Sequence, residues 1–173
     1  MKKIIAILAV AIIGMSMAVK ANAIEDQWSK GTMVVSVLGG IDPWYGSLAF
    51  GGIGAFDYVL VDSWWKGHFT VGGEFDFSVP YKRETAIGIT PRATYGLNIT
   101  PEFEVHVTAE TGFGIRSWQY WNGERDVKTT DSFILWGGFA GCRYFFTENL
   151  AVLAEIGGED WFPALRAGIT YKF

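Results

Sequence analysis

The stretch that decides the fold is His68–Val79, with the sequence HFTVGGEFDFSV. From Phe69 onward every second residue is apolar or glycine, and the residues between are mostly polar: His68, Thr70, Gly72, Glu74, Asp76 and Ser78. Because successive side chains of a β-strand point to opposite faces, the pattern predicts one apolar and one polar face. A membrane-crossing strand needs roughly 9–11 residues, whereas soluble strands have about 5–6. The polar face, with its carboxylates and histidine, suits the inside of a barrel in lipid.

The same alternation recurs along the chain. It predicts seven further strands, at about residues 31–40, 48–60, 85–97, 103–116, 132–146, 150–157 and 164–173. Most connections between them are short, so consecutive strands are expected to pair in antiparallel fashion. An open sheet in lipid would leave two unpaired edges, and each unpaired group costs several kcal/mol, so the sheet must close. The expected fold is all-β, an eight-stranded antiparallel up-and-down transmembrane β-barrel. Within it, Pro91 predicts a local bulge because proline cannot donate to the ladder.

The N-terminal segment Met1–Ala23 has the features of a cleaved secretory signal. Lys2 and Lys3 precede an apolar run, and Ala21-Asn22-Ala23 forms a small-residue cleavage site. The expected organisation is a signal peptide at 1–23, with a helical apolar run, followed by a barrel domain at 24–173. The alternative, an uncleaved membrane helix, fits less well because the apolar run is short for a span of about 20 residues.

Composition excludes several classes of function. The net charge is −4 and no Lys/Arg cluster lies beyond the extreme N-terminus, so a nucleic-acid partner is not expected. Cys142 is the only cysteine, which excludes an internal disulfide; we expect it on an outward face. The common nucleotide-binding, zinc-finger and nucleophile-elbow motifs are missing, and neither a cofactor nor a metal is expected.

The inward faces of the predicted strands carry a nearly balanced set of charges. The candidate lumen network is Glu74, Asp76, Arg92, Glu104, His106, Glu110, Arg116, Arg143, Glu155 and Arg166, with Asp57, His68 and Lys172 also inward. An eight-stranded barrel is only just wide enough for its side chains to fill it. Buried charges must then pair or accept hydrogen bonds, which predicts a plug of ion pairs and water. A narrow path for protons or ions is the alternative, and the two overlap if the pairs rearrange.

The C-terminal strand carries the most specific pattern. Apolar residues alternate up to Tyr171 and the final Phe173. This resembles the terminal signal that the barrel-assembly machinery reads in bacterial outer-membrane barrels. Together with the signal sequence and the eight strands, the chain resembles the small outer-membrane barrel superfamily of OmpA transmembrane domains, OmpX, OmpW and opacity-type proteins. The segment Arg143–Leu150 is similar to their inner-side turn. The resemblance implies the outer membrane as location, its lipid as surroundings and both chain ends in the periplasm.

This topology places the turns at 61–66, 98–102 and 147–149 in the periplasm. The connections at 41–47, 80–84, 117–131 and 158–163 then lie outside. Aromatic residues near both ends predict interfacial girdles, which include Trp161 and Phe162 on the outer side. The longest connection, 117–131, offers Trp118, Tyr120, Trp121 and Arg125 as contact candidates for a host or envelope partner; the alternative is a solvated hairpin tip above the girdle.

His68 and His106 predict two lumen histidines near the periplasmic end, one strand apart. With Glu104 they also suggest a metal site, but two histidines satisfied by hydrogen bonds are the interpretation that we favour. Each begins a His-x-Thr sequence. Outer-membrane lipid A deacylases use a similar His-x-Ser, facing lipid near the outer leaflet, whereas these pairs are expected inside at the opposite end.

Three functions remain open at this point. The first is a non-enzymatic structural or surface-interaction barrel with a charge-plugged lumen, and the second is a narrow channel for small or apolar solutes. The third is an outer-membrane lipid-modifying enzyme. A soluble eight-stranded ligand carrier is the alternative fold, and it requires apolar residues inside and polar ones outside.

Overall fold

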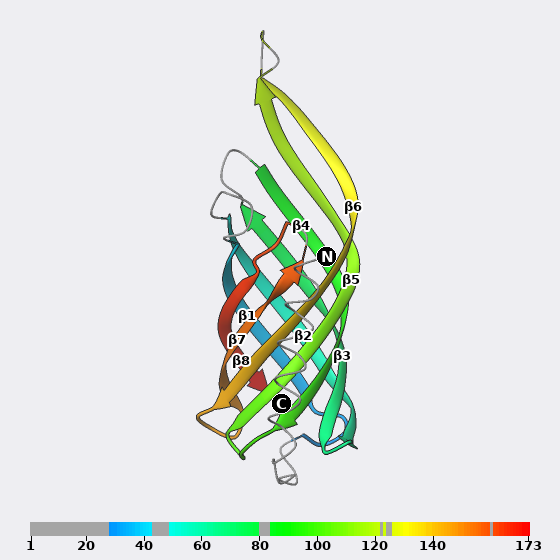
Figure 1. Cartoon of the computed structure of the whole chain (residues 1–173), viewed down its shortest axis with the longest axis vertical. Coiled ribbons are helices and arrows are strands. Elements are labelled where there is room, and N and C mark those ends of the chain that lie inside the picture. Colours follow the sequence, from blue (N-terminus) through cyan, green and yellow to red (C-terminus); the bar gives the residue numbers. More distant parts are fainter. Residues whose placement is uncertain (1–27, 43–48, 80–83, 122, 124–125, 160) are drawn as a thin grey trace.

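The chain forms one closed barrel. The computed structural model describes residues 28–42, 49–79, 84–121, 123, 126–159 and 161–173; the predicted signal peptide at 1–23 lies outside them. The strands are β1 (Met33–Asp42), β2 (Ala49–Trp64), β3 (Gly67–Val79), β4 (Glu84–Asn98), β5 (Phe103–Trp121), β6 (Asp126–Phe145), β7 (Leu150–Glu159) and β8 (Leu165–Lys172). Each pairs with the next in antiparallel fashion, and β1 pairs with β8 from Val34↔Lys172 to Ile41↔Leu165. The predicted architecture is confirmed (Figure 1).

The side chains alternate across the barrel wall as predicted. On β3, Glu74 and Asp76 are buried, whereas Phe75 and Phe77 are 50% and 40% exposed. Other outward side chains are equally apolar, among them Val37, Ile89, Phe113 and Ile134. A soluble ligand carrier needs the opposite orientation, so that alternative is wrong. No helix among the described residues is long and apolar enough to cross a membrane.

The two ends of the barrel differ. One end, called here the turn end, carries the short connections at Trp65–Lys66, 99–102 and 146–149. Trp65 and Lys66 have φ angles of 50° and 67°, the conformation that a two-residue hairpin turn requires. The predicted turn at 61–66 was therefore too long, since β2 continues to Trp64.

At the opposite end, β5 and β6 continue as a two-stranded ribbon far beyond the other strands (Figure 1). This end is called the ribbon end. The pairing runs to Trp121↔Asp126, so most of the predicted connection 117–131 is strand. The fifth strand was predicted to end too early, at 116, and the sixth to begin too late, at 132. Polar residues occupy both faces of the ribbon, for example Lys128 and Thr129 at adjacent positions of β6, so the alternation used for prediction is lost there.

The predicted bulge at Pro91 is absent. Pro91 lies opposite Gly73 of β3 with an exposed side chain, and the β3–β4 register is the same on both sides of it. Thr90 and Pro91 do not pair with β5. The pairing resumes at Arg92↔Glu110, in the same register as Ile89↔Phe113. The missing donor thus interrupts the ladder without shifting it.

Candidate functional site: the charged lumen

The lumen carries the chemistry-bearing side chains. The structure buries Glu74, Asp76, Arg92, Glu104, His106, Glu110, Arg143, Glu155 and Arg166 there, together with Asp57 and His68. Two further buried carboxylates, Asp42 and Glu159, were not predicted because both stood within expected turns. If the predicted strands had been extended by two residues, from 40 to 42 and from 157 to 159, the alternation would have placed both carboxylates inside.

A first group of charges lies near the turn end. Arg143 Nη1 donates to both carboxylate oxygens of Glu104, at 2.9 and 3.1 Å. The same carboxylate lies 3.7 Å from His68 Nε2 and 3.3 Å from His106 Nδ1. His106 Nε2 in turn lies 3.1 Å from Glu155 Oε1. Among the described residues, the His106 ring thus has one hydrogen-bond partner, Glu155, whereas His68 Nε2 and His106 Nδ1 face Glu104 without a hydrogen bond. The interpretation of two histidines satisfied by hydrogen bonds therefore holds for one nitrogen of His106 only.

Glycines make room for the two imidazole rings. A Cβ at Gly96 would lie 2.4 Å from His68 Cε1, and a Cβ at Gly141 would lie 2.5 Å from His106 Nε2. Gly96 is opposite both His68 on β3 and His106 on β5, and Gly141 is opposite His106 on β6. The glycines on the inward face thus set where large side chains fit.

Arg92 occupies the middle of the lumen. Its guanidinium forms ion pairs with Glu74, with Asp57 at 3.3 Å and with Glu155 at 3.4 Å. Nη2 also reaches Thr108 Oγ1 at 3.4 Å. One cation therefore joins carboxylates from β2, β3 and β7 across the barrel.

Nearer the ribbon end, Arg166 also joins carboxylates from several strands. Nη1 donates to Glu74 Oε1 at 2.5 Å, and Nη2 contacts Glu159 at 2.9 Å and Glu110 at 3.5 Å. Asp76 Oδ1 lies 3.8 Å from the same Nη2. The Phe139 ring lies under the guanidinium, 3.6 Å from centroid to Cζ, and Nε donates to Pro163 O. Burial on every side fixes this arginine in one orientation.

Apolar clusters lie at both ends of this network. The turn-end cap consists of Trp28, Val34, Val59, Phe145 and Ala151. The ribbon-end cap consists of Ala86, Leu135 and Phe162, with Phe133 and Trp161 packed against it. No role was predicted for Trp28 from the sequence, and Phe162 was expected in the outer girdle. Phe162 is fully buried, so its assignment to the girdle was wrong.

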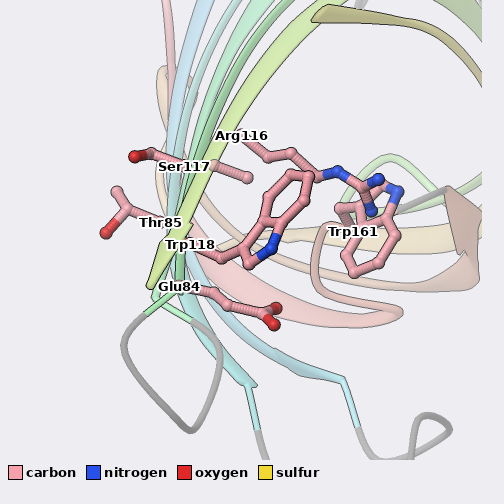
Figure 2. Close-up of a pocket in the computed structure, with 7 residues that line it drawn as sticks. Glu84, Thr85, Arg116, Ser117, Trp118 and Trp161 are labelled. Carbon is pink, nitrogen blue, oxygen red and sulfur yellow. The ribbon is translucent and has the colours of Figure 1, made fainter. Parts of the chain in front are cut away.

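Arg116 lies outside the central network, at the ribbon end. Its guanidinium is 4.6 Å from the Trp118 ring and 4.2 Å from the Trp161 ring (Figure 2). Asp131 Oδ2 lies 3.7 Å from Arg116 Nη2. Together with Glu84 and the hydroxyl residues Thr85 and Ser117 it lines a pocket of about 90 Å³. Trp161 adopts a φ of 71°, an uncommon value for a residue with a side chain. Arg116 and Trp118 thus come together at the base of the ribbon.

The remaining predicted residues lie away from the network. Tyr120 and Trp121 are exposed on the ribbon, and Arg125 lies outside the described residues. Tyr171 and Phe173 are exposed on the barrel wall at the turn end, in an edge-to-face contact at 4.8 Å. Lys172 lies over the Trp28 ring, 5.6 Å from its centroid. Cys142 is on the outward face, next to the inward Arg143.

Comparisons with known proteins identify the fold. No family model and no curated protein sequence matches the chain. Among solved structures, Neisserial surface protein A matches with a TM-score of 0.61 at 17% identity, over 84% of this chain and 98% of that one. A de novo designed transmembrane β-barrel matches with 0.59 at 17% identity, over 84% and 98%. Ail, the attachment invasion locus protein of Yersinia pestis, matches with 0.52 at 13% identity, over 84% and 100%.

These structures and the apolar outer wall define the class. The chain has the fold of the small eight-stranded transmembrane β-barrels. The match to a designed barrel also means that the shared fold, by itself, specifies no activity.

Proposed function

We propose that the protein is a non-enzymatic barrel with a structural or surface-interaction role and a lumen that does not conduct. The main support is the closure of the lumen. Arg143, Arg92 and Arg166 each pair with carboxylates at successive levels, and an apolar cap lies beyond each end of this stack. An ion that crossed would have to separate buried pairs, and an unpaired buried charge is very costly.

In this proposal the turn end faces the periplasm and the ribbon faces outward. An even number of strands puts the start of β1 and the end of β8 at the same end of the barrel, which fits a domain that the signal sequence 1–23 exports to the periplasm before membrane insertion. Tyr171 and Phe173 would then present the C-terminal signal to the barrel-assembly machinery. Lipid of the outer membrane would cover the apolar wall.

The ribbon is the proposed contact surface for a host or envelope partner. It carries Tyr120 and Trp121, which are 50% and 64% exposed, on a paired scaffold of strands. Aromatic side chains held on a rigid element lose little entropy on binding, which favours them as contact residues. Two proteins that share this fold, Neisserial surface protein A and the attachment invasion locus protein Ail, support a surface role.

Planar-bilayer recording tests the closed lumen. The refolded wild-type barrel is expected to give no steady conductance. A variant with Arg92→Ala, Trp28→Ala and Phe162→Ala removes the arginine in the middle of the lumen and one large aromatic residue from each cap, and it is expected to give measurable openings. A steady open state in the wild type would overturn the proposal and favour the narrow channel. The observation behind that alternative is that Arg92 shares three carboxylates, so its pairs have other arrangements available.

A lipid-modifying enzyme receives less support. His68 and His106 are buried in the lumen, and Thr70 and Thr108 of the two His-x-Thr pairs are buried with them. Neither pair reaches the lipid-facing wall. Mass spectrometry of lipid A from cells with and without the gene tests this directly, and an altered lipid A would contradict the non-enzymatic proposal.

A further inference from the structure

Carboxylates outnumber guanidinium groups in the part of the lumen nearest the ribbon end. Glu74, Asp76, Glu110 and Glu159, called here the acidic cluster, all contact Arg166. The second nearby cation, Arg92, contacts Glu74 but also serves Asp57 and Glu155. The four carboxyl groups of the cluster thus have one full positive charge, that of Arg166, and a share of the charge of Arg92. Since buried charge must be compensated, the cluster needs either a bound cation or protons on some of its carboxyl groups.

The imbalance extends to the whole described lumen. Eight carboxylate residues are buried there, against three arginines: Asp42, Asp57, Glu74, Asp76, Glu104, Glu110, Glu155 and Glu159 against Arg92, Arg143 and Arg166. The two histidines lie at the turn end, beside Glu104 and Glu155. They therefore do not serve the acidic cluster.

The cluster has the geometry of a cation site. One oxygen from each of Glu74, Glu110 and Glu159 lies within 4.8 Å of the others. Calcium binds oxygens at about 2.3–2.6 Å, so two ligands on opposite sides of an ion are about 5 Å apart. The three glutamates come from β3, β5 and β7, alternate strands that together span half of the barrel wall.

Unpaired oxygens gather at the same place. Asp76 is fully buried, and neither of its carboxylate oxygens accepts a hydrogen bond from a described residue. Glu110 and Glu159 each give one oxygen to Arg166 and keep the other, Oε2 and Oε1, without a donor. The buried hydroxyls of Ser78 and Thr90, two residues from Asp76 and opposite Glu74, also lack partners among the described residues. Carboxylate and hydroxyl oxygens without nitrogen or sulfur ligands are the set that hard cations prefer.

The backbone leaves room for this arrangement. A Cβ at Gly137 would lie 2.9 Å from Glu110 Oε1 and 3.0 Å from Glu159 Cβ. The ribbon-end cap lies close by, because Arg166 donates to the carbonyl of Pro163, the residue after Phe162. An ion held here would be shielded from the outer solvent.

From these observations we propose that the acidic cluster binds one divalent hard cation, with calcium as the best fit. Glu74, Glu110 and Glu159 are its carboxylate ligands, and Asp76 supplies the remaining negative charge. An irregular set of oxygens suits calcium, whereas magnesium demands near-octahedral geometry and keeps several of its waters. Bound inside the cap, the ion links β3, β5 and β7 and stabilises the half of the barrel from which the ribbon extends.

The test measures retained calcium. Wild-type barrel is refolded with calcium, passed into calcium-free buffer at neutral pH, and its metal content is determined by mass spectrometry. About one calcium per barrel is expected. Glu159→Gln and Asp76→Asn keep the side-chain shape but remove charge, and each is expected to weaken calcium binding by roughly tenfold or more. Glu155→Gln changes a lumen carboxylate of the same strand, β7, outside the cluster, and is expected to keep the ion.

Heat unfolding of the same samples gives a second readout. The unfolding midpoint of wild type should rise when calcium is present during refolding, and that of Glu159→Gln should not change. The proposal is overturned if wild type retains no calcium, or if all variants retain it equally, which would mean binding at the surface only. It is also overturned if acidification alone raises the midpoint and calcium does not, since protons would then neutralise the cluster.

Discussion

The Trp28 indole stacks on the His68 imidazole, with ring centroids 4.3 Å apart and planes inclined by 20°. Trp28 Nε1 also donates to Asn98 Oδ1 at 3.2 Å, and Phe145 meets the indole edge-on. The guanidinium of Arg143 lies 5.3 Å from the same ring. A residue ahead of the first strand thus seals the turn end over the charged group.

Removing this seal should both destabilise the barrel and expose its histidine. Trp28→Ala is expected to lower the free energy of unfolding by about 3 kcal/mol, the usual cost of truncating a buried aromatic side chain. Carbethoxylation of His68 should become faster because solvent then reaches the ring. Urea unfolding in micelles and mass mapping of the modified peptide measure the two effects. Trp121→Ala on the exposed ribbon is the control, and equal histidine reactivity in both variants would contradict the sealing role.

The Arg143–Glu104 pair predicts strong coupling. Arg143→Met leaves Glu104 buried without its guanidinium, so the free energy of unfolding should fall by about 3–5 kcal/mol. Adding Glu104→Gln removes the unpaired charge and should restore a large part of that loss. A double-mutant cycle on refolded protein measures the coupling. Strict additivity of the two single effects would show that the 2.9 Å contact carries little energy.

The outer wall should reject charge. Ile89 is 64% exposed near the middle of β4, opposite Phe113 of β5. Ile89→Lys is expected to destabilise the barrel in lipid vesicles by about 2–4 kcal/mol, the cost of a lysine at mid-membrane depth. Gln119→Lys, on the exposed ribbon, should change stability by less than about 0.5 kcal/mol. The two variants are compared by unfolding in vesicles, and equal stability would mean that Ile89 does not contact lipid.

The period-two pattern could predict the barrel because the wall separates two chemically opposite surroundings. On β3 the alternation of Phe75 and Phe77 with Glu74 and Asp76 is enough to assign both faces. The ribbon was not predicted because residues 117–121 and 126–131 carry polar side chains on both faces, so the alternation is lost there. The capping roles of Trp28 and Phe162 were not predicted because each residue lies outside the strands, where alternation gives no information. Their roles depend on His68 and Leu135, residues of distant strands that only the closed sheet brings near.

The lumen charges were predictable as a set but not as pairs. Arg166 meets Glu74 across 92 residues of sequence. Which acid an arginine contacts depends on the stagger of the strands around the barrel, and alternation within one strand does not contain that information. The inward position of Glu159 was not predicted for a related reason. The residue types around it do not reveal where strand β7 ends and the turn begins.

The orientation of β3 is the claim on which the rest depends, and spin-label accessibility tests it most directly. Nitroxide labels are placed singly at Phe75 and Phe77 through cysteine, in a Cys142→Ser background, and the barrel is reconstituted in liposomes. We predict frequent collisions with oxygen, which dissolves in lipid, and few with a water-soluble nickel chelate. Frequent collisions with the nickel chelate at both positions would place these side chains in water and would contradict the membrane barrel.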